Sequence, residues 1–157
     1  MSEPELHKAL EPIAWLLGTW QGEGKGIYPT IDSFTYREES RFWHTGRPVM
    51  AYAQRTWILP TDMPAHSEMG FFRPQRDGSI ELVLTHSFGV VEISHGAIGD
   101  GSIAVETTSL SSTPSAKTID GLKRLYELNG ESLRYEVEMA FGGERLQNHL
   151  EAELTRA

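Results

Sequence analysis

Six histidines are the most promising chemical groups in this sequence of 157 residues, which contains no cysteine. Without cysteine the chain has no disulfides, no thiolate ligands for a metal and no cysteine nucleophile. The sequence also lacks a phosphate-binding P-loop, a G-x-S-x-G nucleophile elbow and an H-E-x-x-H zinc motif. The six histidines are His7, His44, His66, His86, His95 and His149.

His86 and His66 stand out because the pattern around each of them predicts an inward-facing side chain. His86 shares one face of an expected strand with three apolar residues, Ile80, Leu82 and Leu84. A buried imidazole needs a polar partner or a ligand. His66 shares a face of the preceding strand with Glu68. The pattern leaves two interpretations open: two interior histidines that face one ligand, or a hydrogen-bonded His–Glu pair in the core.

His149 lies in the last expected strand, within Leu146-Gln147-Asn148-His149-Leu150. Strict alternation places its side chain on the polar face of that strand. An inward-facing His149 therefore requires a β-bulge, or a polar face that lines a cavity while the leucines meet the N-terminal helix. The pattern alone does not choose between these arrangements.

The elements that must position these residues are one short helix and about ten strands. Residues 4–17 carry an apolar stripe at steps of three and four, which predicts a helix that Pro12 breaks or kinks and Gly18 ends. After Gly18 the hydrophobic period changes to two, which is typical of half-buried antiparallel strands. The expected strands cover residues 19–26, 32–43, 49–58, 66–73, 79–86, 90–97, 102–110, 117–128, 132–141 and 145–155.

The connections between these strands are short. Asp77-Gly78, Asp100-Gly101 and Asn129-Gly130 are strong signals for two-residue hairpins. Ten hairpin-linked strands without a helical crossover favour an all-β fold, an antiparallel up-and-down β-barrel whose closure removes exposed edges. A barrel of more than eight strands has room for a ligand, and the helix would plug or flank one end. A two-sheet sandwich is the alternative.

The segment Gly18-Thr19-Trp20-Gln21-Gly22-Glu23-Gly24 superficially resembles a glycine-rich phosphate loop. It lies between a helix and a strand, whereas a dinucleotide-binding loop lies between a strand and a helix. We therefore expect a structural role. Gly18, Gly22 and Gly24 would relieve crowding where the first strand enters the barrel, and Trp20 would plug one end.

Composition narrows the range of partners. The formal net charge of −8 argues against binding to nucleic acid or to an anionic membrane, because both need a basic surface. The N-terminal segment lacks the apolar core of a signal peptide, and no apolar run approaches the ~20 residues that span a bilayer. We expect a single domain over residues 1–157, and the absence of disulfides fits a cytoplasmic protein.

The glycine–tryptophan segment within residues 16–24 resembles the G-x-W-x-G-x-G motif of the nitrobindin family. Tyr28-Pro29-Thr30 follows at the spacing of that family, and residues 146–150 are similar to its C-terminal L-Q-x-H-L motif. Similar segments lie between them, at residues 44–48, 66–72 and 89–92. The resemblance covers nearly the whole chain, and the order and spacing of its pieces make it specific.

This resemblance implies a ten-stranded antiparallel barrel shaped like lipocalins and fatty-acid-binding proteins, with one non-covalent haem b near its mouth. It implies that His149 binds the iron and that Thr30 contacts the haem. It places His66 and Met139 close to the haem. Related sequences often carry Gln or another residue at the position of His86, where an additional imidazole would change ligand binding or coordinate the iron.

By function, the resemblance implies binding of nitric oxide and isomerisation of peroxynitrite to nitrate at ferric haem. His149 would set the electronic properties of the iron, and His66 or His86 would stabilise the anion by hydrogen bonding. The expected partners are these small molecules, and a homodimer remains open.

Two other functions fit the same barrel. The first is a non-enzymatic carrier of a small apolar ligand or lipid, in which Arg55, Arg124 and Tyr126 are candidates to hold a carboxylate. The second is a sensor that passes a nitric oxide signal to a partner protein. Uptake of haem separates both haem-dependent functions from the carrier.

Overall fold

The structure, a computed structural model, describes residues 2–28 and 31–157. In these residues one short helix precedes ten antiparallel strands that close into a barrel. The strands are β1 (Gly18–Tyr28), β2 (Ile31–Trp43), β3 (Met50–Ile58), β4 (Met63–Pro74), β5 (Ser79–His86), β6 (Val90–Gly99), β7 (Ser102–Ser112), β8 (Gly121–Asn129), β9 (Ser132–Ala140) and β10 (Gln147–Arg156).

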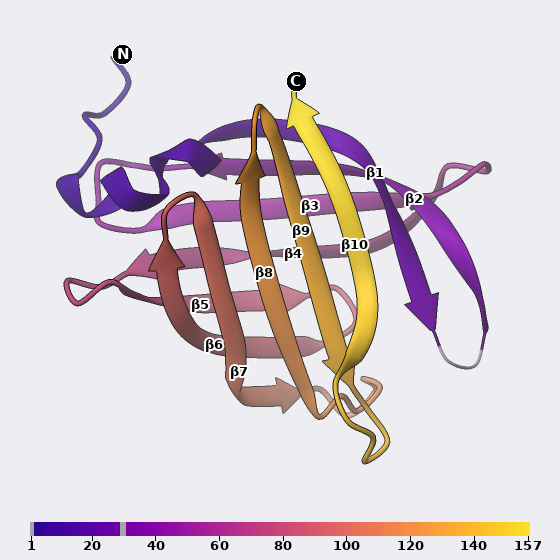
Figure 1. The fold of residues 1–157 in the computed structure, drawn as a ribbon. Helices are drawn as coiled ribbons and strands as arrows, with labels where there is room; N and C mark the ends of the chain where they lie inside the picture. Colours follow the sequence, from indigo (N-terminus) through magenta and orange to yellow (C-terminus); the bar gives the residue numbers. More distant parts are fainter. Residues whose placement is uncertain (1, 29–30) are drawn as a thin grey trace.

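Each strand pairs with its neighbours in sequence, and β1 pairs with β10 to close the barrel. This confirms the predicted up-and-down barrel and excludes the two-sheet sandwich. In Figure 1, β8, β9 and β10 cross in front of β2 to β5 at a steep angle. Among the described residues, no helix has the length and apolar character that crossing a membrane requires.

Strand alternation builds the interior as the sequence predicts. Along β5 the buried residues are Ile80, Leu82, Leu84 and His86, and the residues between them face outward. The apolar part of the interior includes a group of aromatic rings, Phe42, Tyr52, Phe72 and Tyr126, whose centroids lie 4.9–5.5 Å apart in contacting pairs.

The helix η1 (Lys8–Leu16) is shorter than predicted and is a 3₁₀-helix, although it lies in the expected segment. Its buried residues are Leu10, Ile13 and Leu16, spaced by three. Because a 3₁₀-helix has three residues per turn, this spacing places all three on one side. The helix therefore continues through Pro12 instead of breaking there.

Trp20 lies at the end of the barrel that η1 covers. Its side chain is fully buried, and its indole N–H donates to the carbonyl oxygen of Leu16 at 2.8 Å. Arg156 stacks over the Trp20 ring at 4.2 Å and donates hydrogen bonds to the carbonyl oxygens of Leu17 and Trp15. The last residues of β10 thus hold the helix on the barrel.

Gly24 illustrates why β1 is rich in glycine. It pairs with Tyr36 of β2, and the Tyr36 ring lies across the strand. A Cβ atom on Gly24 would lie 2.4 Å from that ring and 2.7 Å from the carbonyl oxygen of Glu151. The glycine lets a large aromatic side chain occupy the space beside the strand.

Several predicted boundaries shift. The strand expected at 117–128 begins only at Gly121, which pairs with Ala140, the last residue of β9, so earlier residues have no partner in that strand. The Asp100-Gly101 hairpin forms as predicted. The turn predicted at Asn129-Gly130 moves by one residue, because Asn129 still pairs with Ser132. At the predicted Asp77-Gly78 hairpin, four residues instead of two join β4 to β5.

Candidate functional site

The candidate site lies at the end of the barrel opposite η1. His66 lies near the start of β4, and His86 ends β5. Met139 lies near the end of β9 and His149 near the start of β10. Because neighbouring strands run antiparallel, all four residues fall at this one end. Thr30 lies outside the described residues.

His149 lies in a β-bulge. On β10, Asn148 pairs with Glu138 of β9, but the next pair joins Leu150 to Val137, so His149 is the extra residue. The opposite neighbour, β1, is irregular between Gly26 and Tyr28 at the same level. Of the two arrangements that the sequence left open, the structure has the bulge, and it explains why simple alternation fails for His149.

The His149 imidazole is half-buried and has a defined orientation. Its Nδ1 lies 3.3 Å from the carbonyl oxygen of Ile27, and because a carbonyl oxygen only accepts, Nδ1 carries the proton. Burial lowers the pKa of His149, the charge of nearby His66 lowers it further, and the Ile27 hydrogen bond partly opposes both. The ring is therefore held neutral with an unprotonated Nε2, the form in which imidazole binds a metal.

His66, Glu68 and His86 converge on one point between β4 and β5. Nε2 of His66 lies 3.2 Å from Oε2 of Glu68 and 3.2 Å from Nδ1 of His86. Nδ1 of His86 is 3.3 Å from the same Glu68 oxygen. Glu68 and His86 are buried, whereas the side chain of His66 is 29% exposed. The structure therefore brings together the three residues whose shared strand faces the sequence indicated.

Arg124 of β8 ties this cluster to the opposite wall. Its guanidinium group donates to both oxygens of Glu68, at 2.8 and 3.1 Å, and to both oxygens of Glu92, at 2.8 and 3.0 Å. Nε2 of His86 lies 2.9 Å from Glu92, and Tyr52 donates to Glu68 at 2.9 Å. Every charged member of this network is buried.

Charge pairing keeps both carboxylates of the network ionised. Burial by itself would raise the pKa of Glu68, but Arg124, His66 and His86 together hold it well below its usual range. Burial opposes ionisation of Glu92 too, yet Arg124 and His86 lower its pKa to about 2. The interior is therefore a fixed arrangement of charges.

A second buried polar cluster surrounds Glu38 of β2. Ser40 and Gln54 donate to one oxygen of Glu38, at 2.6 and 3.0 Å. Tyr135 donates to the other oxygen, and the Tyr36 hydroxyl lies 2.6 Å from that of Tyr135. No cation faces Glu38 in the contacts of the described chain, and burial raises the pKa of this carboxyl group.

Sequence reasoning missed Glu38 and Glu92. Around Glu92 the alternation of residue types is clear, but the orientation of the side chains is the reverse of what it predicts. Val91 and Ile93 are exposed, while Glu92 between them is fully buried. An apolar–acidic alternation favours the opposite orientation, and only the pairing of β6 with β5 reveals the true one.

The residues considered for a carrier function are mostly engaged elsewhere. Arg55 is exposed on the outer wall and pairs with Glu39 at 2.5 Å. Arg124 is buried but already holds two carboxylates, and Tyr126 lies 3.2 Å from it. A ligand carboxylate would therefore have to displace Glu68 or Glu92 from Arg124.

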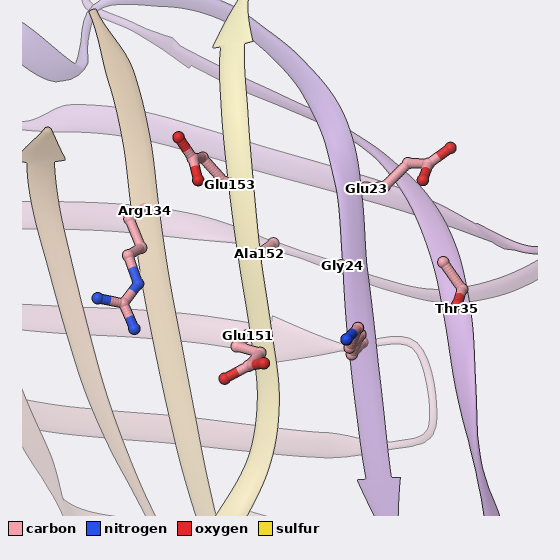
Figure 2. Close-up of a pocket in the computed structure, with 8 residues that line it drawn as sticks. Glu23, Gly24, Thr35, Arg134, Glu151, Ala152 and Glu153 are labelled. Carbon is pink, nitrogen blue, oxygen red and sulfur yellow. The ribbon is translucent and has the colours of Figure 1, made fainter. Parts of the chain in front are cut away.

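A shallow hollow on the outer wall lies apart from the histidines. It has a volume of about 260 Å³ and runs across β9, β10, β1 and β2. Figure 2 shows its charged lining, which includes Glu23, Arg134, Glu151 and Glu153. A small, charged and open surface of this kind does not suit a large apolar cofactor, which needs an enclosed and mostly apolar pocket.

The chain is similar to known proteins over nearly its whole length. Residues 9–156 match the family described as "THAP4-like, heme-binding beta-barrel domain". A relative from Mycolicibacterium paratuberculosis, named peroxynitrite isomerase 1, is 45% identical over 156 residues and 97% of both chains. Peroxynitrite isomerase 2 of Mycobacterium avium is 44% identical over the same length and coverage.

A solved structure shows the same fold. The crystal structure of Rv2717c from M. tuberculosis matches with a TM-score of 0.90 and 39% identity, over 98% of this chain and 99% of that chain. The family match and the structural match each cover nearly all of the barrel, in agreement with the motifs read from the sequence. The chain therefore belongs to the nitrobindin family of THAP4-like haem-binding β-barrel domains.

Proposed function

We propose that this chain binds one haem b non-covalently at the end of the barrel that holds His149. With ferric haem it isomerises peroxynitrite to nitrate, and it also binds nitric oxide. Relatives that are 44–45% identical over 97% of the chain carry the name peroxynitrite isomerase. The observation that carries the proposal is the bulge at His149, because it presents a neutral, oriented imidazole where strict alternation would not.

The residues around His149 fit a haem. The Ile27 carbonyl oxygen fixes Nδ1, which leaves Nε2 as the nitrogen that would bind the iron. Three half-buried apolar side chains lie at the same end and pack on the core: Phe34, Met139 and Leu150. They would supply the apolar walls that a porphyrin ring needs. The family match supports this assignment.

The two remaining histidines have different roles in this proposal. His66 is partly exposed and its charge acts on His149, so it is the residue that we expect to donate a hydrogen bond to a bound anion. His86 is buried and contacts Glu92 through Nε2, so it orients His66 from behind. Glu68 contacts both rings and fixes their positions.

When bound, ferric haem supplies a Lewis-acidic iron that can accept peroxynitrite or nitric oxide as a ligand. The contribution of the chain is to hold His149 neutral and to place a donor, His66, near that ligand. A hydrogen bond donor that is already in place stabilises developing negative charge without reorganisation.

A titration with hemin tests the proposal. The wild-type protein should take up one equivalent and show the Soret band of a histidine-ligated haem. His149→Ala should shift that band and bind hemin at least tenfold more weakly. His95→Ala is the matched control, because His95 is exposed on the outer wall of β6, and it should behave like the wild type.

Rapid mixing of the hemin-loaded protein with peroxynitrite then tests the reaction. Decay should accelerate with protein concentration, and nitrate should be the product. An unchanged Soret band in His149→Ala would reject the ligand assignment. Hemin uptake without faster decay would leave a haem protein of another function.

A further inference from the structure

We propose that His66, Glu68 and His86 form a binding site for one divalent transition-metal ion, with Zn²⁺ as the best match. The proposal goes beyond the haem function and does not depend on it. The three residues offer two imidazole nitrogens and one carboxylate oxygen, and these three atoms lie within 4.8 Å of one another. Two histidines and one glutamate also form a known class of zinc site with an open fourth position.

The distances between the three atoms also match those between the ligands of one metal ion. The three atoms form a nearly equilateral triangle with sides of 3.2, 3.2 and 3.3 Å. Zinc bonds of about 2.0–2.1 Å in a tetrahedron place neighbouring ligand atoms about 3.3–3.4 Å apart. The triangle is therefore already close to one face of a tetrahedral zinc site, and little rearrangement is needed on binding.

Each of the three atoms has a hydrogen-bond partner, but protons can occupy at most two of the three sides of the triangle. Oε2 of Glu68 accepts a hydrogen bond from Arg124 at 3.1 Å, and each ring nitrogen carries at most one proton. If both nitrogens are protonated, their contact with each other is unfavourable. If only one is protonated, its N–H points at one partner and leaves another contact unfilled. A cation just outside the plane of the triangle, about 2.0–2.1 Å from each atom, would contact all three atoms at once.

The surrounding residues have the arrangement that supports metal ligands. If Nδ1 of His86 binds the metal, Nε2–H of His86 would donate a hydrogen bond to Glu92, which lies 2.9 Å away. Glu92, His86 and the metal would then form the carboxylate–histidine–metal arrangement that is common in zinc sites. Arg124 and Tyr52 donate to Oε1 of Glu68 at 2.8 and 2.9 Å, and Arg124 also donates to Oε2 at 3.1 Å, so the carboxylate is held with Oε2 beside the histidines. Such partners fix the ligands before the metal arrives.

The local charge also favours a cation. With both histidines neutral, as metal binding requires, Arg124 contributes one positive charge against the two carboxylates of Glu68 and Glu92. Burial of an uncompensated negative charge is costly, so an additional cation is stabilised there. The side chain of His66 is 29% exposed, so the edge of the cluster is in contact with solvent.

Cobalt and zinc titrations test the site. The full chain, without hemin and without a histidine tag, should bind one equivalent of Co²⁺. It should show the visible absorption of four-coordinate cobalt, and Zn²⁺ should displace that signal. His86→Gln removes one ligand with little change of volume, and it should abolish the visible band and weaken binding at least tenfold.

Three further variants separate this site from others. Glu92→Gln should weaken Co²⁺ binding about 10–100-fold, because it removes the partner of a ligand and not a ligand. His95→Gln, on the outer wall, should bind Co²⁺ like the wild type. His149→Ala should also keep the cobalt signal, since His149 is not one of the three ligands.

Other results would overturn the proposal. They are the absence of saturable Co²⁺ and Zn²⁺ binding to the wild type, wild-type affinity in His86→Gln, or loss of the signal in His149→Ala. The first would mean that the triangle is a hydrogen-bonded core cluster. Far-UV circular dichroism checks that His86→Gln is folded, and His66→Gln, at a partly exposed position, gives the same test if it is not.

Discussion

At the scale of single residues, the pKa values of two buried carboxyl groups in the barrel interior are shifted in opposite directions. Glu92 faces Arg124 and His86, and its pKa falls to about 2. Glu38 is equally buried and accepts hydrogen bonds from Ser40, Gln54 and Tyr135, yet its pKa rises. Neutral donors do not overcome the cost of burial here, whereas a guanidinium group does.

This difference gives a prediction for acid unfolding. Because the folded pKa of Glu92 is depressed from 4.5 to about 2, its stabilising contribution is complete above pH 4.5 and disappears as the pH falls toward 2. A shift of this size corresponds to about 3 kcal/mol. Glu68 acts in the same direction. Glu38 acts in the opposite direction, since its contribution is present at low pH and is lost as the pH rises through its raised folded pKa.

Urea unfolding of the wild type between pH 2 and pH 7 measures this effect. The free energy of unfolding should fall steeply below pH 4.5, and Glu92→Gln should show a shallower fall. An equal slope in both proteins would mean that Glu92 is not the charged, paired group described above.

The sequence predicted part of this residue-level arrangement. Alternation along β4 and β5 was enough to place Glu68 and His86 on interior faces, and both are buried. It could not reveal Arg124 as their partner, because β8 approaches β4 and β6 only across the closed barrel. Contacts across the interior depend on curvature and register, which local periodicity does not contain.

At the scale of elements, β10 shows where periodicity fails. Its inward residues Ala152 and Leu154 follow strict alternation, but the bulge at His149 changes the register of the residues before it. A bulge depends on how both neighbouring strands pair, and β1 is irregular at the same level. The family motif pointed to His149 because it records a residue without needing to know its orientation.

β1 supports a second prediction at this scale, the substitution Gly24→Ala. The added Cβ would meet the Tyr36 ring at 2.4 Å and the Glu151 carbonyl oxygen at 2.7 Å. Because backbone and a buried ring must both move, we expect a loss of about 1–3 kcal/mol in the free energy of unfolding.

Gly121→Ala in β8 is the matched control for Gly24→Ala. There the nearest atom to an added Cβ is Oγ1 of Thr107, at 3.4 Å, so the effect should be small. Urea unfolding of both variants gives the comparison. Equal stability of the two variants would show that Tyr36 does not depend on the glycine beside it.

At the scale of the whole molecule, the two ends of the barrel have separate tasks. One end is closed by η1, Trp20 and Arg156, which bury apolar surface and hold the helix. The other end holds His66, His86 and His149. β10 reaches both ends, with His149 near its start and Arg156 at its end. Stability of the closed end should therefore be separable from the chemistry of the open end.

Arg156→Leu tests this separation. The change removes the contact with the Trp20 ring and the hydrogen bonds to Trp15 and Leu17, so the free energy of unfolding should fall by about 1–2 kcal/mol. Hemin affinity and the Soret band should stay as in the wild type. Arg76→Leu, in the exposed loop before β5, is the control and should change neither property. Weaker hemin binding in Arg156→Leu would mean that the two ends are coupled through β10, and that the helix takes part in shaping the site at the far end of the barrel.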